Sequence, residues 1–295
     1  MKNLNDIKIY HWKGLWKMKV NCAYCTHPGK VRSVNQDGLF LDGEIVMEGN
    51  MTAPVITSRE LREDCGLLAV VDGAGGHNAG GIACQIILAE MAERLLTTPA
   101  SEICITGEMN HIQDKMTKMA KYEPWLSGMA ATLAGLLVIP GGMGEALPGD
   151  MTMKRTASLE CKEVLAFNCG DCRVYHVEER IMAKLTHDHS CVQTLFDDGV
   201  LSEDGMRTHP RKNIVTAALQ ARGEPVELCF RRVEVRSSSR FFICCDGIWE
   251  TLPKKQIEKC TIVPSLQDAA HRLWSEVMNT ECRDNISFIL LDITG

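Results

Sequence analysis

Residues 67–73 read Leu-Leu-Ala-Val-Val-Asp-Gly, an aliphatic run that ends in an aspartate and a glycine. An aliphatic run of this length predicts a buried β-strand, and the Asp-Gly pair predicts a turn where that strand ends. The pattern recurs elsewhere in the chain. The apolar run 241–245 continues into Asp246, and the run 164–167 leads through a short turn to Asp171. Aspartates therefore follow the ends of three predicted strands.

Two further aspartates stand at the beginning of predicted strands, with Asp37 directly before 38–41 and Asp284 shortly before 286–291. In an antiparallel sheet the end of one strand lies beside the start of its neighbour. The five aspartates, which include Asp72, can therefore converge at one edge of a sheet. Their charges would repel one another there unless cations lay between them.

The chemistry of the predicted cluster favours a hard cation. Carboxylates without an accompanying histidine or thiolate suit Mg²⁺ or Mn²⁺ better than Zn²⁺. Gly73 after Asp72, and Gly247 after Asp246, would let the backbone turn sharply and let a carbonyl approach a cation. For a single Asp-Gly pair an ordinary turn is the simpler interpretation, so it is the repetition that favours a metal site.

Arg32, five residues before Asp37, is the natural candidate for binding a phosphate. A guanidinium binds phosphate in a bidentate fork that lysine cannot reproduce. Taken alone, an arginine near a strand is more often a surface charge.

The order of the predicted elements indicates an α+β fold with antiparallel sheets, because strands lie towards both ends and helices are grouped between them. No stretch has the composition of an interdomain linker, so we predict one domain over 21–293 after an N-terminal extension, 1–20. The predicted strands are 38–41, 67–71, 132–139, 164–167, 173–177, 241–245 and 286–291, the predicted helices 79–96, 108–121 and 266–278, and the predicted surface loops 42–63 and 140–160.

Composition excludes several classes of function. The net charge of −6 shows no excess of positive charge, which argues against a nucleic-acid partner. The longest apolar run, 129–140, is too short to span a bilayer, and residues 1–20 lack the apolar stretch of a signal peptide. The 14 cysteines are scattered and lie mostly in apolar runs, which predicts free thiols and a cytoplasmic location.

With these residues assembled, the chain resembles the metal-dependent protein phosphatase (PPM) family in its bacterial form. Eight short blocks occur in the family's order and cover nearly all of the chain between Arg32 and Ser287. They are Val-Arg-Ser-Val-Asn-Gln-Asp (31–37), Val-Asp-Gly-Ala-Gly-Gly-His-Asn-Ala-Gly (71–80), Gly-Met-Ala-Ala-Thr-Leu (128–133), Asn-Cys-Gly-Asp-Cys-Arg (168–173), Leu-Thr-His-Asp-His-Ser (185–190), His-Pro-Arg-Lys-Asn (209–213), Cys-Asp-Gly-Ile-Trp-Glu (245–250) and Asp-Asn-Ile-Ser (284–287).

The resemblance implies a β-sandwich of two antiparallel sheets flanked by helices, with a metal cluster at one edge. It also implies a role for each matching residue. Asp72 would bridge two metal ions, the Gly73 carbonyl would complete the coordination of one of them, and Asp246 and Asp284 would hold the other. Asp171 with Asp246 would bind a third, weaker ion. Asp37 would orient metal-bound water, and Arg32 would bind the substrate phosphate.

The activity implied by the resemblance is hydrolysis of phosphoserine and phosphothreonine on proteins, by attack of a metal-bridging hydroxide and without a phosphoenzyme. The cofactors would be two core Mg²⁺ or Mn²⁺ ions with a weaker third. The substrates would be phosphoproteins made by a Ser/Thr kinase, which is a signalling role, and the segment 191–219 would be a mobile flap that influences substrate choice.

The chain departs from the family pattern at two positions. Cys172 stands where a serine is usual, and Ala74 stands where eukaryotic relatives often have a histidine. His77 follows three residues after Ala74, and we hypothesise that it does not protonate the leaving group. Two alternatives keep the fold but change the function: a pseudophosphatase that only binds partners, and a phosphatase of small phosphoesters.

Three other patterns have simpler explanations. The glycine-rich segment 72–81 lacks the endings of nucleotide-binding loops. The pairs Cys22/Cys25 and Cys169/Cys172 resemble zinc ligands, but the two pairs are far apart in sequence, so we predict buried thiols. The stretch His187-Asp188-His189 precedes a predicted helix, where a structural role in turns and caps is expected.

Overall fold

A computed structural model describes residues 19–47, 51–61, 66–75, 79–96, 98–139, 162–178, 181–222, 224–235 and 238–293. Most of the N-terminal extension, the predicted loop 140–160 and His77 lie outside the described residues. No helix in the described ranges combines the length and the apolar character that crossing a bilayer requires.

Two antiparallel sheets form the centre of the molecule. The first has the order β4 (Val55–Glu60), β1 (Lys19–His27), β13 (Ile286–Ile293), β12 (Ser239–Cys244), β8 (Arg173–Glu178) and β9 (Ile181–Lys184). The second has the order β11 (Cys229–Val235), β7 (Lys162–Cys169), β6 (Ala130–Ile139), β5 (Gly66–Ala74), β2 (Gly38–Leu41) and β3 (Glu44–Val46), with the short strand β10 (Leu219–Gln220) paired to β6.

The sheets pack face to face because alternate residues of each central strand point into the space between them. In β5, Leu68 and Val70 belong to this inner core, where they meet Ile243 and Leu291 of the other sheet in one buried cluster. The intervening residues of β5 point to the opposite face, where Val71 joins a second cluster with α1 and α2. Both faces of the central strands are therefore apolar, which explains their continuous aliphatic runs.

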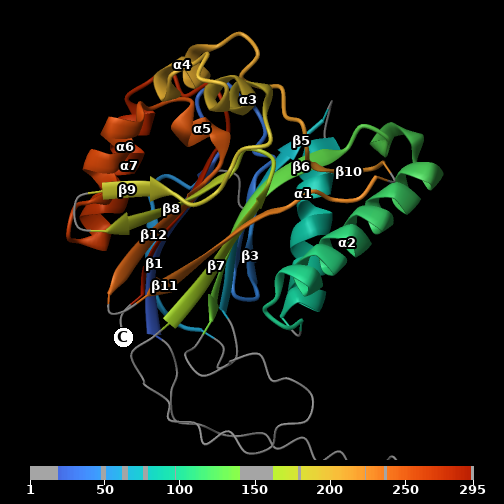
Figure 1. The fold of residues 1–295 in the computed structure, drawn as a ribbon, viewed down its shortest axis with the longest axis horizontal. Coiled ribbons are helices and arrows are strands. Elements are labelled where there is room, and N and C mark those ends of the chain that lie inside the picture. The colour runs from blue at the N-terminus through green and yellow to red at the C-terminus, as the bar shows by residue number, and fades with distance from the viewer. Residues whose placement is uncertain are drawn as a thin grey trace, which may run out of the picture.

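Helices cover the two outer faces of the sandwich (Figure 1). The outer face of the second sheet carries α1 (Ala79–Glu90), which continues into a π-helical turn (Met91–Leu95), and α2 (Glu102–Tyr122), which is followed by a 3₁₀ turn (Pro124–Leu126). The outer face of the first sheet carries α6 (Lys254–Thr261) and α7 (Leu266–Met278). The short helices α3 (Cys191–Asp197), α4 (Glu203–Thr208) and α5 (Asp246–Trp249) gather at one end of the sandwich.

The predicted fold class is confirmed, because the structure has two antiparallel sheets flanked by helices. The prediction of a surface loop over 42–63 is wrong in part, since β3 and β4 lie within it. Both are edge strands with exposed and polar residues, so the apolar signal of a strand is weak in them. The helix predicted over 108–121 begins earlier, at Glu102, after the N-cap Ser101 accepts a hydrogen bond from the Cys104 amide.

Candidate active site

The predicted site residues meet at the end of the sandwich that α3–α5 surround. Antiparallel pairing brings strand ends beside strand starts: Gly38 at the start of β2 pairs with Val71 near the end of β5. Likewise, Cys244 at the end of β12 pairs with Phe288 near the start of β13. This pairing places Asp37, which precedes β2, beside Asp72 near the end of β5. In the same way it places Asp284, which precedes β13, beside Asp246, which follows β12.

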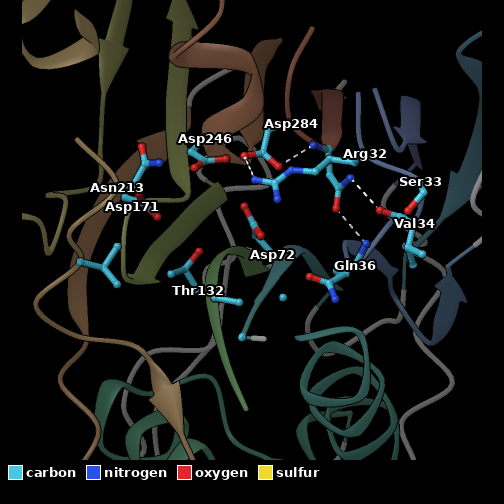
Figure 2. Close-up of a pocket in the computed structure, with 15 residues that line it drawn as sticks. Arg32, Ser33, Val34, Gln36, Asp72, Thr132, Asp171, Asn213, Asp246 and Asp284 are labelled. Carbon is cyan, nitrogen blue, oxygen red and sulfur yellow. Dashed lines mark hydrogen bonds and ion pairs between the residues drawn. The ribbon is translucent and has the colours of Figure 1, made fainter. Parts of the chain in front are cut away.

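An open pocket of about 650 Å³ occupies this end of the molecule (Figure 2). Every site residue predicted from the sequence lines it except Asp37, which is fully buried close to Asp72. In Figure 2, Asp72 lies near the centre of the pocket, with Asp246 and Asp284 above it. The predicted residues that line the pocket are Arg32, Asp72, Gly73, Asp171, Asp246 and Asp284.

Asp37 is the most enclosed carboxylate of the group, with an exposed fraction of 0%. Neither of its carboxylate oxygens receives a well-formed hydrogen bond, although Ser287 and Cys245 are close enough to lower its pKa in part. One ligand atom from each of Asp37, Asp72 and Cys245 lies within 4.8 Å of the other two. A buried carboxylate without partners is costly unless a proton or a cation compensates its charge.

Four carboxyl groups of the cluster have raised pKa values, chiefly because they are buried: Asp37, Asp72, Asp171 and Asp246. The pKa of Asp37 is raised to about 7 and that of Asp246 to about 6, with repulsion from neighbouring aspartates adding to burial. Burial and the charge of Asp246 raise the pKa of Asp171 to about 8. The pKa of Asp72 is raised well above its usual value by burial and by repulsion from Asp37 and the other carboxylates.

The donor set fits a hard divalent cation. Four aspartates line the pocket, and carboxylate oxygens are the ligands that Mg²⁺ and Mn²⁺ prefer. The sequence analysis did not place a thiol among them, but the Cys245 sulfur lies beside Asp37 and Asp72. Burial and the nearby aspartates raise the pKa of Cys245 well above its usual value, and its sulfur accepts a hydrogen bond from the Ser287 amide at 3.1 Å. Without a bound cation, Cys245 is therefore a neutral thiol beside the two carboxylates.

Arg32 reaches the cluster from the loop before β2. Its Nη2 donates to Oδ2 of Asp284 at 2.8 Å, while its side chain remains 57% exposed. Figure 2 shows the guanidinium between Asp284 and the open pocket. A guanidinium has five N–H donors, so contact with one carboxylate oxygen leaves others for a ligand in the pocket.

The turn that carries Asp171 has little conformational freedom. Gly170 has φ of +97°, and a Cβ atom at this position would lie 2.3 Å from Cγ2 of Thr132. The amide of Gly170 donates to Nδ1 of His189, and the Trp249 indole donates to the Asp171 carbonyl at 3.0 Å. The turn therefore requires glycine, and Asp171 is fixed from two sides.

A buried ionic network lies directly behind this turn. Arg173 is nearly fully buried and binds Asp188 through Nε at 2.9 Å and through Nη2 at 2.5 Å. Lys184 donates to the same carboxylate at 3.1 Å, and the Arg173 guanidinium lies 3.6 Å from the centre of the Trp249 ring. Asp188 and His189 have a structural role, as predicted, but Asp188 forms a buried ion pair with Arg173 instead of a turn or cap bond, and His189 binds the Gly170 amide.

The segment predicted to be a flap forms the wall opposite Arg32, where it contributes Asn213 and Val215 to the pocket. It also contacts the helix that begins at Asp246, because Lys212 forms an ion pair with Glu250. A second contact joins Glu203 of α4 to Lys254 of α6 at 3.0 Å. The segment is thus attached to α5 and α6, beside the aspartates.

The four cysteines that resembled zinc ligands are free and buried, as predicted. Across the described ranges, the Asp37–Asp72–Cys245 group is the one set of three or more His, Cys, Asp or Glu side chains close enough to share a metal ion. Several further residues of the pocket wall had no predicted role in the site, although all but Val215 stand in the quoted motif blocks: Ser33, Val34, Gln36, Thr132, Asn213, Val215 and Asn285.

The raised pKa values predict how pH affects the metal-free protein. Above about pH 4 the unfolded chain has released protons that the folded protein still holds, on Asp246 up to about pH 6, on Asp37 up to about pH 7 and on Asp171 up to about pH 8. The unfolded state therefore binds fewer protons, and the free energy of unfolding falls as pH rises through this window. Thermal unfolding in chelator should give a higher Tm at pH 5 than at pH 8.5, and Mg²⁺ should raise the Tm more at pH 8.5.

The Asp171→Asn variant provides the internal comparison, because it removes the carboxyl whose pKa is raised to about 8. Its metal-free Tm should decline less between pH 7 and pH 8.5 than that of the unaltered protein. An equal decline in both proteins would contradict the assignment of this pH window to the cluster.

Comparison with known proteins relates this architecture to phosphatases. No protein-family model matches the chain. The serine/threonine phosphatase stp of Listeria monocytogenes is 29% identical over 284 residues, covering 92% of this chain and 96% of the relative. The serine/threonine protein phosphatase PstP of Mycobacterium tuberculosis is 25% identical over 229 residues, which are 77% of this chain but only 40% of that relative.

A solved structure gives the same result for the fold. The catalytic domain of PstP, in complex with two manganese ions, superposes with a TM-score of 0.69 over 94% of this chain and 100% of that chain, at 23% identity. The resemblance inferred from the sequence motifs is thereby confirmed. The two-sheet sandwich and these relationships identify the chain as a homologue of the bacterial PPM-type serine/threonine phosphatases.

Proposed function

We propose that this chain is a metal-dependent phosphatase that hydrolyses phosphoserine and phosphothreonine in proteins. The observation that carries the proposal is the convergence of Asp72, Asp171, Asp246 and Asp284 on one pocket beside Arg32. Carboxylates and a guanidinium in one pocket provide both halves of a phosphoryl-transfer site, since one binds cations and the other binds phosphate. The names of the relatives support the same activity.

Each residue of the cluster has a proposed role. Asp72, the Gly73 carbonyl, Asp246 and Asp284 would hold two core ions, and Asp171 with Asp246 would hold a weaker third. When bound, Mg²⁺ or Mn²⁺ would supply a hydroxide nucleophile at neutral pH and would offset negative charge on the phosphoryl oxygens.

The remaining chemistry belongs to side chains. Arg32 would orient the phosphoryl group, because its guanidinium faces the pocket from beside Asp284. Asp37, buried next to Asp72, would accept a hydrogen bond from the attacking water and so align it. We propose direct transfer of the phosphoryl group to water, without a phosphoenzyme, because the cluster supplies an activated water and needs no protein nucleophile.

The proposed arrangement extends to the rest of the chain. Residues 21–293 would act as one catalytic domain, and 191–219 would act as a flap whose residues Asn213 and Val215 contact the substrate beside the phosphate. The substrates would be phosphoproteins produced by a Ser/Thr kinase.

The proposal is tested by measuring phosphate release from a phosphothreonine peptide. The protein is first treated with chelator, and Mg²⁺ or Mn²⁺ is then added back. We expect no turnover in chelator and full recovery with either ion, and mass spectrometry of quenched enzyme should find no phosphorylated site residue. Folded protein that stays inactive with both ions and several phosphopeptides would instead support a binding module, and turnover limited to small phosphoesters would contradict the substrate class.

A further inference from the structure

The side chain of Asn285 binds the backbone of the Arg32 loop at three positions. Its Nδ2 donates to the carbonyl of Pro28 at 3.2 Å and to that of Val34 at 3.1 Å. Its Oδ1 accepts from the amide of Gln36 at 2.8 Å. The residue is 7% exposed, so these bonds are largely shielded from water. Both donors and the acceptor of this amide are thus used on one loop.

Polar contacts hold the loop, and besides those of Asn285 they include bonds from Lys30 to Thr280, from Arg32 to Asp284 and from Asn35 to Thr26. Residues 30–34 are all exposed, and Val31 and Val34 are 66% and 51% exposed, so the loop is not held by burial of apolar side chains. Its start is joined to the segment before β13, where the Lys30 amide donates to the Cys282 carbonyl at 2.8 Å. The course of the chain through Arg32 therefore depends on hydrogen bonds, and three of them come from Asn285.

The backbone of Asn285 is itself fixed against the segment that carries Asp246. A Cβ atom at Gly247 would lie 1.9 Å from the Asn285 carbonyl oxygen, so the two backbones are in direct contact. The Cys245 thiol donates to the same oxygen at 3.5 Å. Asn285 thus connects the Arg32 loop to the residues on either side of Asp246, and it directly follows Asp284.

We propose that Asn285 is a positioning residue, which sets the distance between the Arg32 guanidinium and the aspartate cluster that a bound phosphoryl group has to bridge. The inference rests on the proposed function. Its physical basis is that the Arg32 loop is exposed, so without the three Asn285 bonds its backbone would sample more positions, and a phosphate contact is productive only at some of them. Asn285 acts through Arg32 and does not itself contact the phosphate.

The test compares Asn285→Ala and Asn285→Asp with Arg32→Ala, using a phosphothreonine peptide and saturating Mn²⁺. The aspartate variant keeps the size of the side chain and the acceptor for Gln36, but it loses both Nδ2 donors. Each Asn285 variant should raise KM by about 10- to 100-fold while lowering kcat less. In the Arg32→Ala background, the same substitutions should raise KM by less than about threefold, because the guanidinium that Asn285 positions is no longer there.

Two further measurements separate this role from others. Mn²⁺ affinity, measured by calorimetry, should change little in either Asn285 variant, whereas Asp284→Asn should weaken it strongly. Hydrogen exchange at the Gln36 amide should accelerate in Asn285→Ala, and this readout does not require activity. Asn279→Ala, at the exposed end of α7, is the matched control and should leave every value unchanged.

The proposal is overturned if the Asn285 and Arg32 effects are additive, or if Asn285→Ala weakens Mn²⁺ binding as much as Asp284→Asn does. It is also overturned if Gln36 exchange is unaffected. If the unaltered protein proves inactive, the proposed function fails, and the exchange measurement still decides whether Asn285 braces the loop.

Discussion

The Asp246→Asn variant is expected to lose more than about 100-fold in kcat/KM towards a phosphothreonine peptide. Removing a residue that only hydrogen-bonds to a metal ligand already lowers metal affinity or activity by about 10- to 100-fold. Asp246 has a central place in the cluster: it raises the pKa of Asp171, it begins α5 and it lines the pocket. An asparagine keeps the shape of the side chain but removes the negative charge that would bind a cation. The measurement is steady-state kinetics over a range of Mn²⁺ concentrations.

The comparison variant is Asp204→Asn, which changes an acidic residue in the first turn of α4 that does not line the pocket. It should retain full activity. Excess Mn²⁺ should restore part of the lost rate in Asp246→Asn if the defect is weakened metal binding. A variant with unchanged kcat/KM at low Mn²⁺ would exclude Asp246 from the metal site.

The Arg173→Ala variant is expected to lower the free energy of unfolding by about 3–5 kcal/mol, the range for removing one partner of a buried ion pair. Asp188 is almost completely buried and would keep only Lys184 as a charged partner. The Trp249 ring would also lose the guanidinium that now lies 3.6 Å from its centre. Urea denaturation followed by circular dichroism measures the change.

Arg283→Ala is the matched control, because Arg283 pairs with Glu281 on the surface, where both side chains are more than 70% exposed. Exposed pairs contribute about 0–1 kcal/mol, so this variant should unfold almost like the unaltered protein. If Arg173→Ala unfolds at the same urea concentration as the control, the network behind Asp171 does not stabilise the fold as argued.

The sequence predicted most of the central strands and missed the peripheral ones, and burial explains most of the difference. The exception is β1, a largely buried strand between β4 and β13 that was not predicted. The run 67–71 is aliphatic because β5 has the inner core on one face and α1 on the other. The edge strands β3 and β4 have exposed positions and polar residues, so they resemble loops. The helices α4 and α5, of six and four residues, are too short to show helical periodicity.

The site residues that stand directly at the end or the start of a strand were predictable from the sequence. Asp72 and Asp284 could be expected at one sheet edge because antiparallel pairing brings strand ends and strand starts together. Asn213 and Cys245 were not predictable in this way. Asn213 reaches the pocket through the packing of the segment around α3 and α4, and the approach of Cys245 to Asp37 depends on side-chain orientation across the two sheets.

The position of β13 has a consequence for biosynthesis. This strand comes after all the other described elements in the chain, yet it lies between β1 and β12 in the interior of its sheet. While a ribosome is still making the preceding residues, β1 and β12 lack the neighbour that joins them, and Asp284 and Asn285 are absent. A nascent chain that still lacks β13 would therefore carry an unfinished sheet and an incomplete pocket, so the pocket forms only after β13 has been made.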